Sequence, residues 1–293
     1  MRHVALITGL VASAIAAGAQ KPSQKIERGW PLDMDGAVRI HNYNGSVVVT
    51  GWDKDSVAVT AVIGGKMGLF GGGGRRGVKF GLESASDQTA PVADFTVFVP
   101  SRARLSVRGA ATMIEIRNFA GTVDASALSG RVRISGSVTE ITAETMDGDL
   151  EVESSPAYFR GKTATGRITW TGSSDDASLN TVSGAITVTS STLHRARFES
   201  ISGDVKFTGT IKPDGRVTLD SHGGDVSATL ARDARAEVTI DAPKGNVLGT
   251  EFVRPAGKAL QYASVPHSGS SGTTRTADLV LRSFKGRVSV AQP

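Results

Sequence analysis

The sequence predicts an all-β protein built as a β-solenoid, similar to a single-stranded β-helix, with rungs of 18–21 residues. Three observations predict it: a glycine that recurs at a near-constant interval, alternation of apolar and polar residues on both sides of it, and few aromatic residues. Aromatic residues make up 5% of the chain, whereas 35 of its 293 residues are glycine. Such a composition favours a narrow, regular interior over the wide core of a globular domain.

The recurring glycine follows a small or polar residue and precedes Val, Ile or Leu by two positions. Successive copies are separated by 18, 18, 18, 19, 21 and 21 residues, at Gly130, Gly148, Gly166, Gly184, Gly203, Gly224 and Gly245. Glycine suits a turn where φ is positive or where neighbouring backbone passes closely. A repeat of this length indicates stacked rungs.

One strand is predicted after each glycine and another before it. The second and fourth residues after the glycine are apolar and flank a more polar one, as Leu150 and Val152 flank Glu151. The seventh and fifth residues before it are apolar or small, and large residues lie beside small ones, as Phe159 lies near Gly161. This offset suits a slot of fixed width between two facing sheets.

The pattern extends beyond the central repeats. We expect rungs around Gly45 and Gly121, and a last rung around Gly286 that follows a loop-rich excursion over residues 249–277. The solenoid domain is accordingly predicted to span residues 111–293. Two strands per rung account for the period, but a triangular coil of three strands or a series of antiparallel hairpins would show the same alternation.

Charges test the register. Rungs 18 residues apart place Arg131 beside Asp149 on one face and Glu144 beside Lys162 on the other. Opposite charges on neighbouring strands favour pairing, so the charge pattern supports this alignment.

A separate amino-terminal β region is predicted over residues 37–110, after a linker over residues 20–36. Its strands are expected over residues 56–63, 78–82, 94–99 and 105–107. Because an open rung exposes unpaired backbone groups, we expect these strands and the excursion to cover the two ends of the solenoid.

A glycine-rich stretch over residues 64–77 is predicted to form the mobile tip of a hairpin. It lacks the Gly-Lys-Ser/Thr ending and the following helix of a phosphate-binding loop. In an alternative hypothesis, Met67, Leu69 and Phe70 are exposed and contact a membrane or a partner.

Residues 1–19 have the features of a secretory signal peptide. A polar start precedes an apolar stretch over residues 4–17, and Ala17-Gly18-Ala19 matches a signal cleavage site. The apolar stretch is shorter than the roughly 20 residues that cross a bilayer. We predict cleavage before Gln20, export to the periplasm or the cell exterior, and no transmembrane segment after cleavage.

The charge balance bears on the class of partner. The formal net charge is +5 and the pI is about 9.6, which favours anionic surfaces such as lipid headgroups or acidic polysaccharide. The basic residues are scattered along the sequence, and the tight pair Arg75-Arg76 lacks interleaved aromatic residues, so no nucleic-acid partner is expected. The absence of cysteine excludes disulfides and thiolate chemistry.

No catalytic, cofactor-binding or metal-ligating residues are predicted. The histidines, at positions 3, 41, 194, 222 and 267, show no ligand spacing. An enzyme hypothesis, in which a polysaccharide lyase or hydrolase uses the β-helix scaffold, rests on Asp204, Asp220, Asp225 and His222. Carboxylate catalysis needs two groups at a defined separation, whereas aspartate is common at the turns where these residues are expected.

The sequence AVRIHNYNGSVVVTGWD at residues 37–53, with SGAI at 183–186 and SGDV at 202–205, resembles bacterial proteins with the DUF4097 domain, often labelled adhesins. The resemblance covers most of the mature chain. It implies an exported or envelope-associated β-solenoid without established catalysis, and it assigns no functional residues.

We therefore expect an exported, non-enzymatic, adhesin-like module of the cell envelope, with a binding or structural role. Polysaccharide, an envelope component or a protein is the expected partner, and the sequence leaves the oligomeric state open. Two alternatives stand beside this hypothesis: the polysaccharide-active enzyme, and a signalling or scaffold module that acts through a protein partner.

Overall fold

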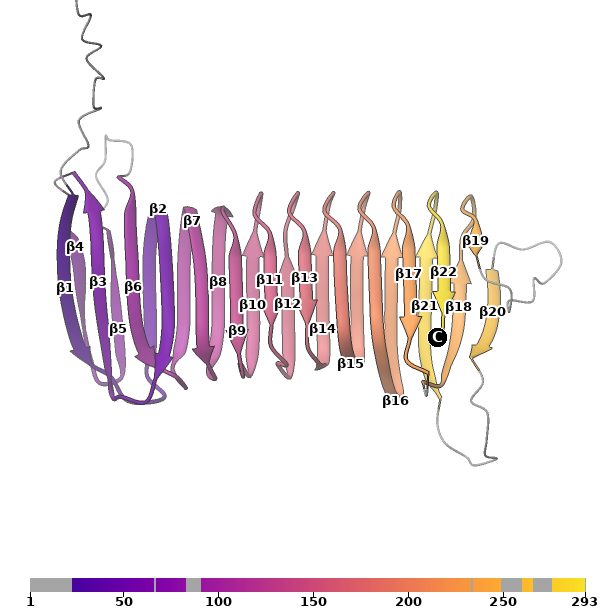
Figure 1. Ribbon diagram of the computed structural model, residues 1–293, viewed down its shortest axis with the longest axis horizontal. Helices are drawn as coiled ribbons and strands as arrows, with labels where there is room; N and C mark the ends of the chain where they lie inside the picture. Colours follow the sequence, from indigo (N-terminus) through magenta and orange to yellow (C-terminus); the bar gives the residue numbers. More distant parts are fainter. Residues whose placement is uncertain are drawn as a thin grey trace, which may run out of the picture.

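The computed structural model is a single row of β-strands stacked side by side (Figure 1). Its described residues are 23–65, 67–82, 91–232, 234–248, 260–265 and 276–292. All regular elements in this part of the chain are strands, which confirms the all-β class and the β-solenoid. The predicted signal peptide lies outside the described residues, as does most of the predicted excursion.

The strands fall into three groups along the chain. The amino-terminal strands are β1 (Ser23–Pro31), β2 (Ala37–Trp52), β3 (Ser56–Gly64), β4 (Leu69–Gly74), β5 (Gly77–Leu82), β6 (Ala93–Pro100) and β7 (Arg104–Phe119). The central strands are β8 (Thr122–Ser129), β9 (Val132–Gly136), β10 (Glu140–Thr145), β11 (Leu150–Glu153), β12 (Tyr158–Lys162), β13 (Ile168–Thr171) and β14 (Ser174–Thr181). The last are β15 (Ile186–Ser200), β16 (Val205–Ser221), β17 (Val226–Leu230), β18 (Ala236–Asp241), β19 (Val247–Leu248), β20 (Leu260–Val265), β21 (Ala277–Ser283) and β22 (Val288–Ala291).

Each central rung has two strands, one in each of two facing layers. Strands that precede a repeat glycine form sheet A, in which β8, β10, β12 and β14 pair in parallel. Strands that follow it form sheet B, in which β9, β11, β13 and β15 pair in parallel. Ile141 pairs with Phe159 and Phe159 with Ala177, which confirms the 18-residue register.

Long strands pass from one sheet to the other. Strands β2 and β7 pair along their length: their first halves lie in sheet A, where β7 also pairs with β8, and their second halves lie in sheet B, where β7 also pairs with β9. In β15 and β16 the first part lies in sheet B and the second part in sheet A.

The core lies between the two sheets and is filled by the predicted alternating residues. Trp170 from sheet B is fully buried, and its ring meets Phe159 at 5.1 Å and Phe198 at 6.4 Å between centroids, both edge to face. The indole N–H donates to the Ser154 carbonyl at 3.0 Å, so burial of its polar group is satisfied. Small residues such as Gly161, whose added Cβ would meet the Leu179 side chain at 2.7 Å, leave room for these rings.

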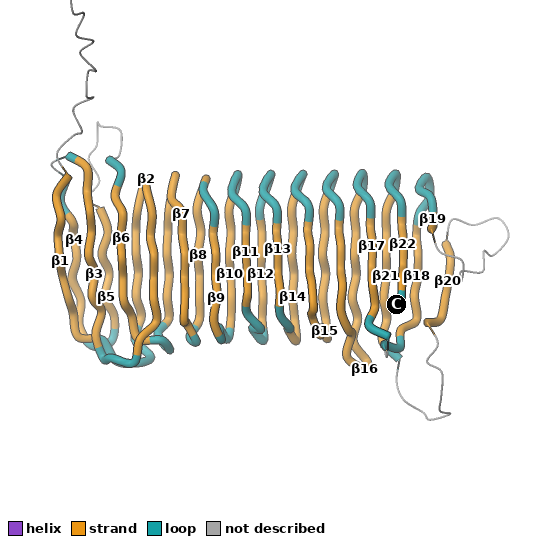
Figure 2. The backbone as a smooth tube through the Cα atoms, in the orientation of Figure 1, coloured by secondary structure: helices purple, strands orange, loops and turns teal. Residues whose placement is uncertain are grey.

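The repeat glycines lie in a row of turns along the upper edge of Figure 2, where the chain passes from sheet A to sheet B. We call this the apex edge. A Cβ on Gly166 would lie 1.9 Å from the carbonyl oxygen of Gly148 in the rung before it. Close stacking of the turns therefore requires glycine here.

A ladder of buried hydroxyl groups reinforces the apex edge. Ser or Thr stands three residues before the glycine in most rungs, although Gly130 and Gly245 have Ala127 and Ala242 there. The Ser200 hydroxyl accepts the Gly203 N–H at 2.8 Å and donates to the Gly184 carbonyl at 3.2 Å. Ser221 repeats both bonds one rung further. Each hydroxyl thus closes its own turn and ties it to the rung before.

At the amino-terminal end, the order of the strands in space differs from their order in the sequence. Strands β5 and β6 form a rung outside β2, although they follow it in the chain. Antiparallel strands then cover this rung: β4 pairs with β5, β3 with β6, and β1 with β3. The predicted cover of this end by amino-terminal strands is confirmed.

The carboxyl-terminal end breaks the order in the opposite way. The last rung of the sequence, β21 and β22, lies between the rung of β16 and β17 and the rung of β18 and β19. The Gln292 side chain donates to the carbonyls of Ala231, Arg232 and Ala234, the segment that passes this inserted rung. Strand β20, in the predicted excursion, pairs antiparallel with β18 and covers sheet A.

Several predicted boundaries are wrong. The linker over residues 20–36 contains β1, and the glycine-rich tip over residues 64–77 contains β4, because its glycines pair with β5. The separate region over residues 37–110 contains β2 and half of β7, which already belong to the parallel stack.

The rung expected around Gly121 is also misplaced. The register aligns Thr112, not Gly121, with Gly45 at the apex edge. Ile114 consequently lies in sheet B and Val123 in sheet A, the reverse of the order that the Gly121 frame gives.

Candidate functional site

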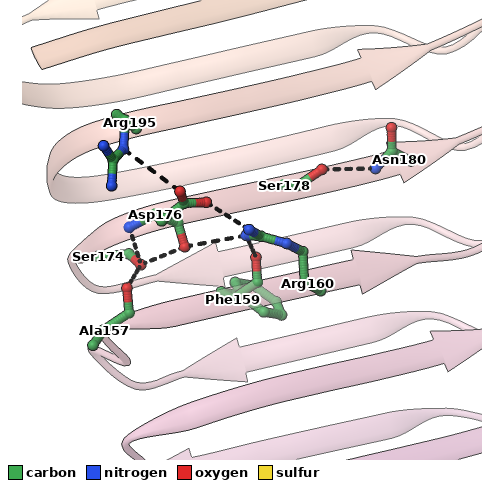
Figure 3. Close-up of polar contacts among 8 residues, drawn as sticks. All are labelled: Ala157, Phe159, Arg160, Ser174, Asp176, Ser178, Asn180 and Arg195. Carbon is green, nitrogen blue, oxygen red and sulfur yellow. Dashed lines mark hydrogen bonds and ion pairs between the residues drawn. The ribbon is translucent and has the colours of Figure 1, made fainter.

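The outer surface of sheet A carries columns of charged side chains that are mostly compensated in the centre. Asp176 lies between two arginines from neighbouring rungs, at 2.7 Å from Arg160 and 3.5 Å from Arg195 (Figure 3). Ser174 donates to the Ala157 carbonyl and accepts the Asp176 N–H, which fixes the start of β14.

Charge pairing on sheet B runs diagonally. Arg133 pairs in register with Glu151, but its guanidinium donates to Glu153 at 2.9 Å. Arg131 reaches Glu151 at 3.3 Å rather than its neighbour Asp149. The predicted register is confirmed, whereas the ion pairs join residues two positions out of register.

The amino-terminal end of sheet A is different, because its cations gather without matching carboxylates. Lys79 on β5 lies beside Arg39 on β2, and His41 on β2 lies beside Arg108 on β7. Arg104 begins β7 in the same sheet. We call these five residues the cationic patch.

One member of the patch is neutralised. Arg108 forms an ion pair with Asp124. Among the described residues, no carboxylate lies within ion-pair distance of Arg39, Lys79 or Arg104, and all three are exposed. The patch therefore carries unbalanced positive charge on a flat surface.

The pKa of His41 reflects its partial burial and the positive charge of the patch. Partial burial lowers the pKa below its ordinary value of 6.5, and the positive charges of Lys79, Arg108 and Arg39 lower it further. A group that resists gaining a positive charge marks a surface that attracts negative charge. The patch is thus suited to carboxylate, sulfate or phosphate groups of a ligand.

The residues of the enzyme hypothesis are not brought together. Asp220 lies on sheet A beside Glu199, whereas Asp204 and Asp225 lie at the start of sheet B. His222 lies in the apex turn, stacked on Phe284 at 4.8 Å between ring centroids.

Asp204 and Asp225 line a shallow groove of about 450 Å³ on sheet B. The Asp204 carboxylate accepts the Asp225 N–H at 2.8 Å, and Asp225 accepts the main-chain N–H and the guanidinium of Arg287 at 2.8 and 2.7 Å. The two hydrogen bonds from Arg287 lower the pKa of Asp225, which opposes a role as general acid.

The pKa of Asp220 is raised, first by burial and then by Glu199 and Asp241, although Arg282 and Arg197 oppose the shift. A raised pKa suits a general acid, but the partner carboxylates of the hypothesis lie in the other sheet. The groups that two-carboxylate catalysis requires are therefore divided between two faces.

The other candidate residues from the sequence are not brought together either. His41 and His194 are separate in the structure, and His3 and His267 lie outside the described residues. The described residues contain no group of ligands suited to a metal ion. Met67, Leu69 and Phe70 are half-buried rather than exposed, and Met67 and Leu69 pack against the core.

The cationic patch was not predicted, because residues 37–110 were expected to form a β region separate from the stack. Once β2 is aligned on Gly45, Arg39 occupies an outward position in the same column as Lys79. The alternation of Arg39 and His41 with buried Val38 and Ile40 was the available signal.

The family comparison gives a clear result. The chain matches the DUF4097 family, described as Toastrack, over residues 10–259 and belongs to that family. This confirms the resemblance identified from the sequence. No functionally curated protein shows significant similarity to the chain.

Solved structures offer distant likenesses. The chain is 11% identical to a "putative adhesin" from Bacteroides fragilis, with 91% of this chain and 97% of that one covered and a TM-score of 0.40. A "putative adhesin" from Parabacteroides distasonis is 10% identical, with 92% of this chain and 97% of that one covered and a TM-score of 0.37. A "putative cell adhesion protein" from Clostridium sporogenes is 6% identical, with 93% of this chain and 100% of that one covered and a TM-score of 0.24. Likeness at this level does not transfer a function. Within the described residues, no helix is long and apolar enough to cross a membrane.

Proposed function

We propose that the protein is an exported, non-enzymatic, adhesin-like module that binds an acidic polysaccharide of the cell envelope through sheet A. The observation that carries this proposal is the cationic patch, in which Arg39, Lys79 and Arg104 stand exposed without carboxylate partners among the described residues. Export by a signal peptide over residues 1–19 belongs to the same proposal.

The flat stack suits an extended, repeating ligand. Parallel strands lie roughly 4.8 Å apart, so the cations on β5, β2 and β7 form a closely spaced row. Several carboxylates of one chain can therefore meet the patch at once, and many weak contacts add up by multivalency. Such binding is mainly electrostatic and falls with salt.

Binding to alginate, a polymer of uronic acids, tests the proposal, with neutral dextran for comparison. The protein without residues 1–19 retains every described residue and is the form to use. We expect salt-sensitive binding to alginate, and a loss of about tenfold or more when Arg39, Lys79 and Arg104 are all changed to Gln.

A matched control removes the same charge elsewhere on sheet A. Arg160, Arg195 and Arg197 are paired with Asp176 or Glu199, so their change to Gln lowers the net charge equally without touching the patch. Equal loss of binding in both triple variants would contradict a localised site. Shortening of the alginate chains during the assay would contradict the non-enzymatic proposal.

A further inference from the structure

An exposed row of apolar side chains follows the apex edge. In each turn, the residue two positions before the repeat glycine points outward, and we call this row the apex ridge. Its exposed apolar members are, in spatial order, Tyr43, Leu128, Met146, Val182, Ile201 and Pro243. The same position is half-buried at Ala110, Ala164 and Phe284, where Ala110 precedes Thr112 instead of a glycine, and it is polar at His222.

Main-chain bonds hold the ridge in register. The N–H of Ala164 donates to the Met146 carbonyl at 3.0 Å, Val182 to Ala164 at 3.1 Å, and Ile201 to Val182 at 3.1 Å. Successive side chains therefore stand roughly 4.8 Å apart in a straight line. Because these N–H groups bond within the protein, the ridge offers side chains rather than backbone to a partner.

The ridge is apolar against the preference of its own turn. In most turns the next residue is of the kind that turns favour, such as Ser129, Thr165, Ser183 and Ser202. The ridge position instead carries Leu128, Met146, Val182 and Ile201, which are 59%, 54%, 50% and 57% exposed.

Folding does not require these large side chains, because the same position accommodates Ala110 and Ala164. Isolated exposed apolar residues need no explanation, whereas an aligned row of them marks an interaction surface. The sequence periodicity that reveals the rungs also contains this row.

Charge defines the kind of partner. At the carboxyl-terminal end of the ridge, Lys285 and Lys244 are exposed in the turns, and the Lys244 ammonium lies 4.8 Å from the Phe284 ring centroid. An apolar line that ends in exposed cations matches a membrane surface that contains anionic lipids.

We propose that the apex ridge docks the protein edge-on onto a lipid bilayer with anionic headgroups. The aliphatic side chains enter the interface between headgroups and acyl chains, and the terminal cations contact lipid phosphates. This goes beyond the proposed polysaccharide binding, because it uses another surface and another ligand. In this orientation both sheets stand away from the membrane and stay accessible.

Co-sedimentation with vesicles tests the proposal, using mixed phosphatidylcholine and phosphatidylglycerol against phosphatidylcholine alone. The ridge variant combines Leu128→Ser, Met146→Ser, Val182→Ser and Ile201→Ser. The control variant removes exposed apolar side chains elsewhere, with Val62→Thr, Val92→Ser and Tyr158→Ser. We expect binding that increases with phosphatidylglycerol, a loss of about tenfold or more in the ridge variant, and little change in the control.

A second measurement locates the contact directly. The natural chain has no cysteine, so Ala164→Cys on the ridge and Tyr158→Cys on sheet A each accept one environment-sensitive dye. We expect a blue shift on vesicles at position 164 and none at position 158.

Absence of vesicle binding, equal loss in both variants, or a shift only at position 158 would overturn the proposal. A dimer that the ridge substitutions dissociate, without vesicle binding, would assign the ridge to a second copy instead. Alginate binding by the ridge variant separates this outcome from failure of the polysaccharide proposal, since the cationic patch is intact in that variant.

Discussion

The centre and the ends of the molecule are stacked by different rules. From β8 to β14 each rung follows its predecessor in space as in sequence, whereas β5 with β6 and β21 with β22 occupy positions that the chain order does not give. The centre needs only local repetition, because each rung pairs with the rung made just before it. The ends depend on segments that return from elsewhere in the chain, and this closes the stack against further pairing.

The largest expected effect comes from removing the inserted rung. Deletion of residues 276–293 removes β21 and β22, so β16 and β17 lose their partners on one side and β18 loses its attachment to the stack. We expect loss of cooperative folding at the carboxyl-terminal end, measured by urea unfolding with circular dichroism.

Deletion of β1 is the matched comparison at the other end. This strand pairs only with β3 among the described strands and is largely exposed, so its loss should cost much less stability. If the carboxyl-terminal deletion leaves stability unchanged, β18 has moved into the vacant position, and the inserted rung is not essential for closure.

Removal of a large buried ring tests whether the centre and an end of the stack unfold together. Trp170→Ala in the centre and Phe80→Ala at the amino-terminal end each remove a fully buried ring, at a cost of about 3–5 kcal/mol. Since each rung contacts mainly its neighbours, hydrogen exchange should rise near the substituted ring first.

Tyr158→Ala is the control, because this side chain is exposed on the outer face of sheet A. Uniform loss of protection along the whole stack in either core variant would show that centre and ends form one cooperative unit.

The hydroxyl ladder gives a smaller effect. Ser200→Ala leaves the Gly203 N–H and the Gly184 carbonyl without their side-chain partner, at an expected cost of about 1–3 kcal/mol. Ser202→Ala in the same turn removes an exposed hydroxyl, whose long 3.4 Å bond to the Val182 carbonyl water can replace, and should change the free energy of unfolding by less than about 0.5 kcal/mol. Equal stability of the two variants by urea unfolding would argue against a structural role of the ladder.

Sequence reasoning succeeded where the physics is local. The alternation around Gly148 and Gly166 identified buried residues such as Leu150 and Ile168, because strand faces follow from a period of two. It missed the inserted rung because Leu281 suits any position in sheet A, and nothing in the repeat ranks one neighbour above another.

The candidate surfaces were predictable to different degrees. The apex ridge follows from the glycine frame alone, since Met146 and Val182 occupy the same position in it. The cationic patch depends on the pairing of Lys79 with Arg39, which results from the return of β5 to the outside of β2. A long-range pairing of this kind leaves no period in the sequence.

The smallest expected effect is a difference between the two ends in how stability depends on pH. His41 at the amino-terminal end has a folded pKa below its ordinary value of 6.5, so its contribution to stability is present above that value and is lost as pH falls below it. Asp220 near the carboxyl-terminal end has a folded pKa above its ordinary value of 3.8, so its contribution is present below 3.8 and is lost as pH rises through the folded pKa.

The two substitutions should therefore stabilise the protein in opposite pH ranges. His41→Gln should reduce the loss of stability that acid produces below pH 6.5, and Asp220→Asn should raise stability at neutral pH with no gain below pH 3.8. Urea midpoints measured across this range for both variants and the natural chain check the signs. A gain in stability over the same pH range in both variants would show that the ends do not differ in charge as the pKa shifts indicate, and it would weaken the case for a localised cationic patch.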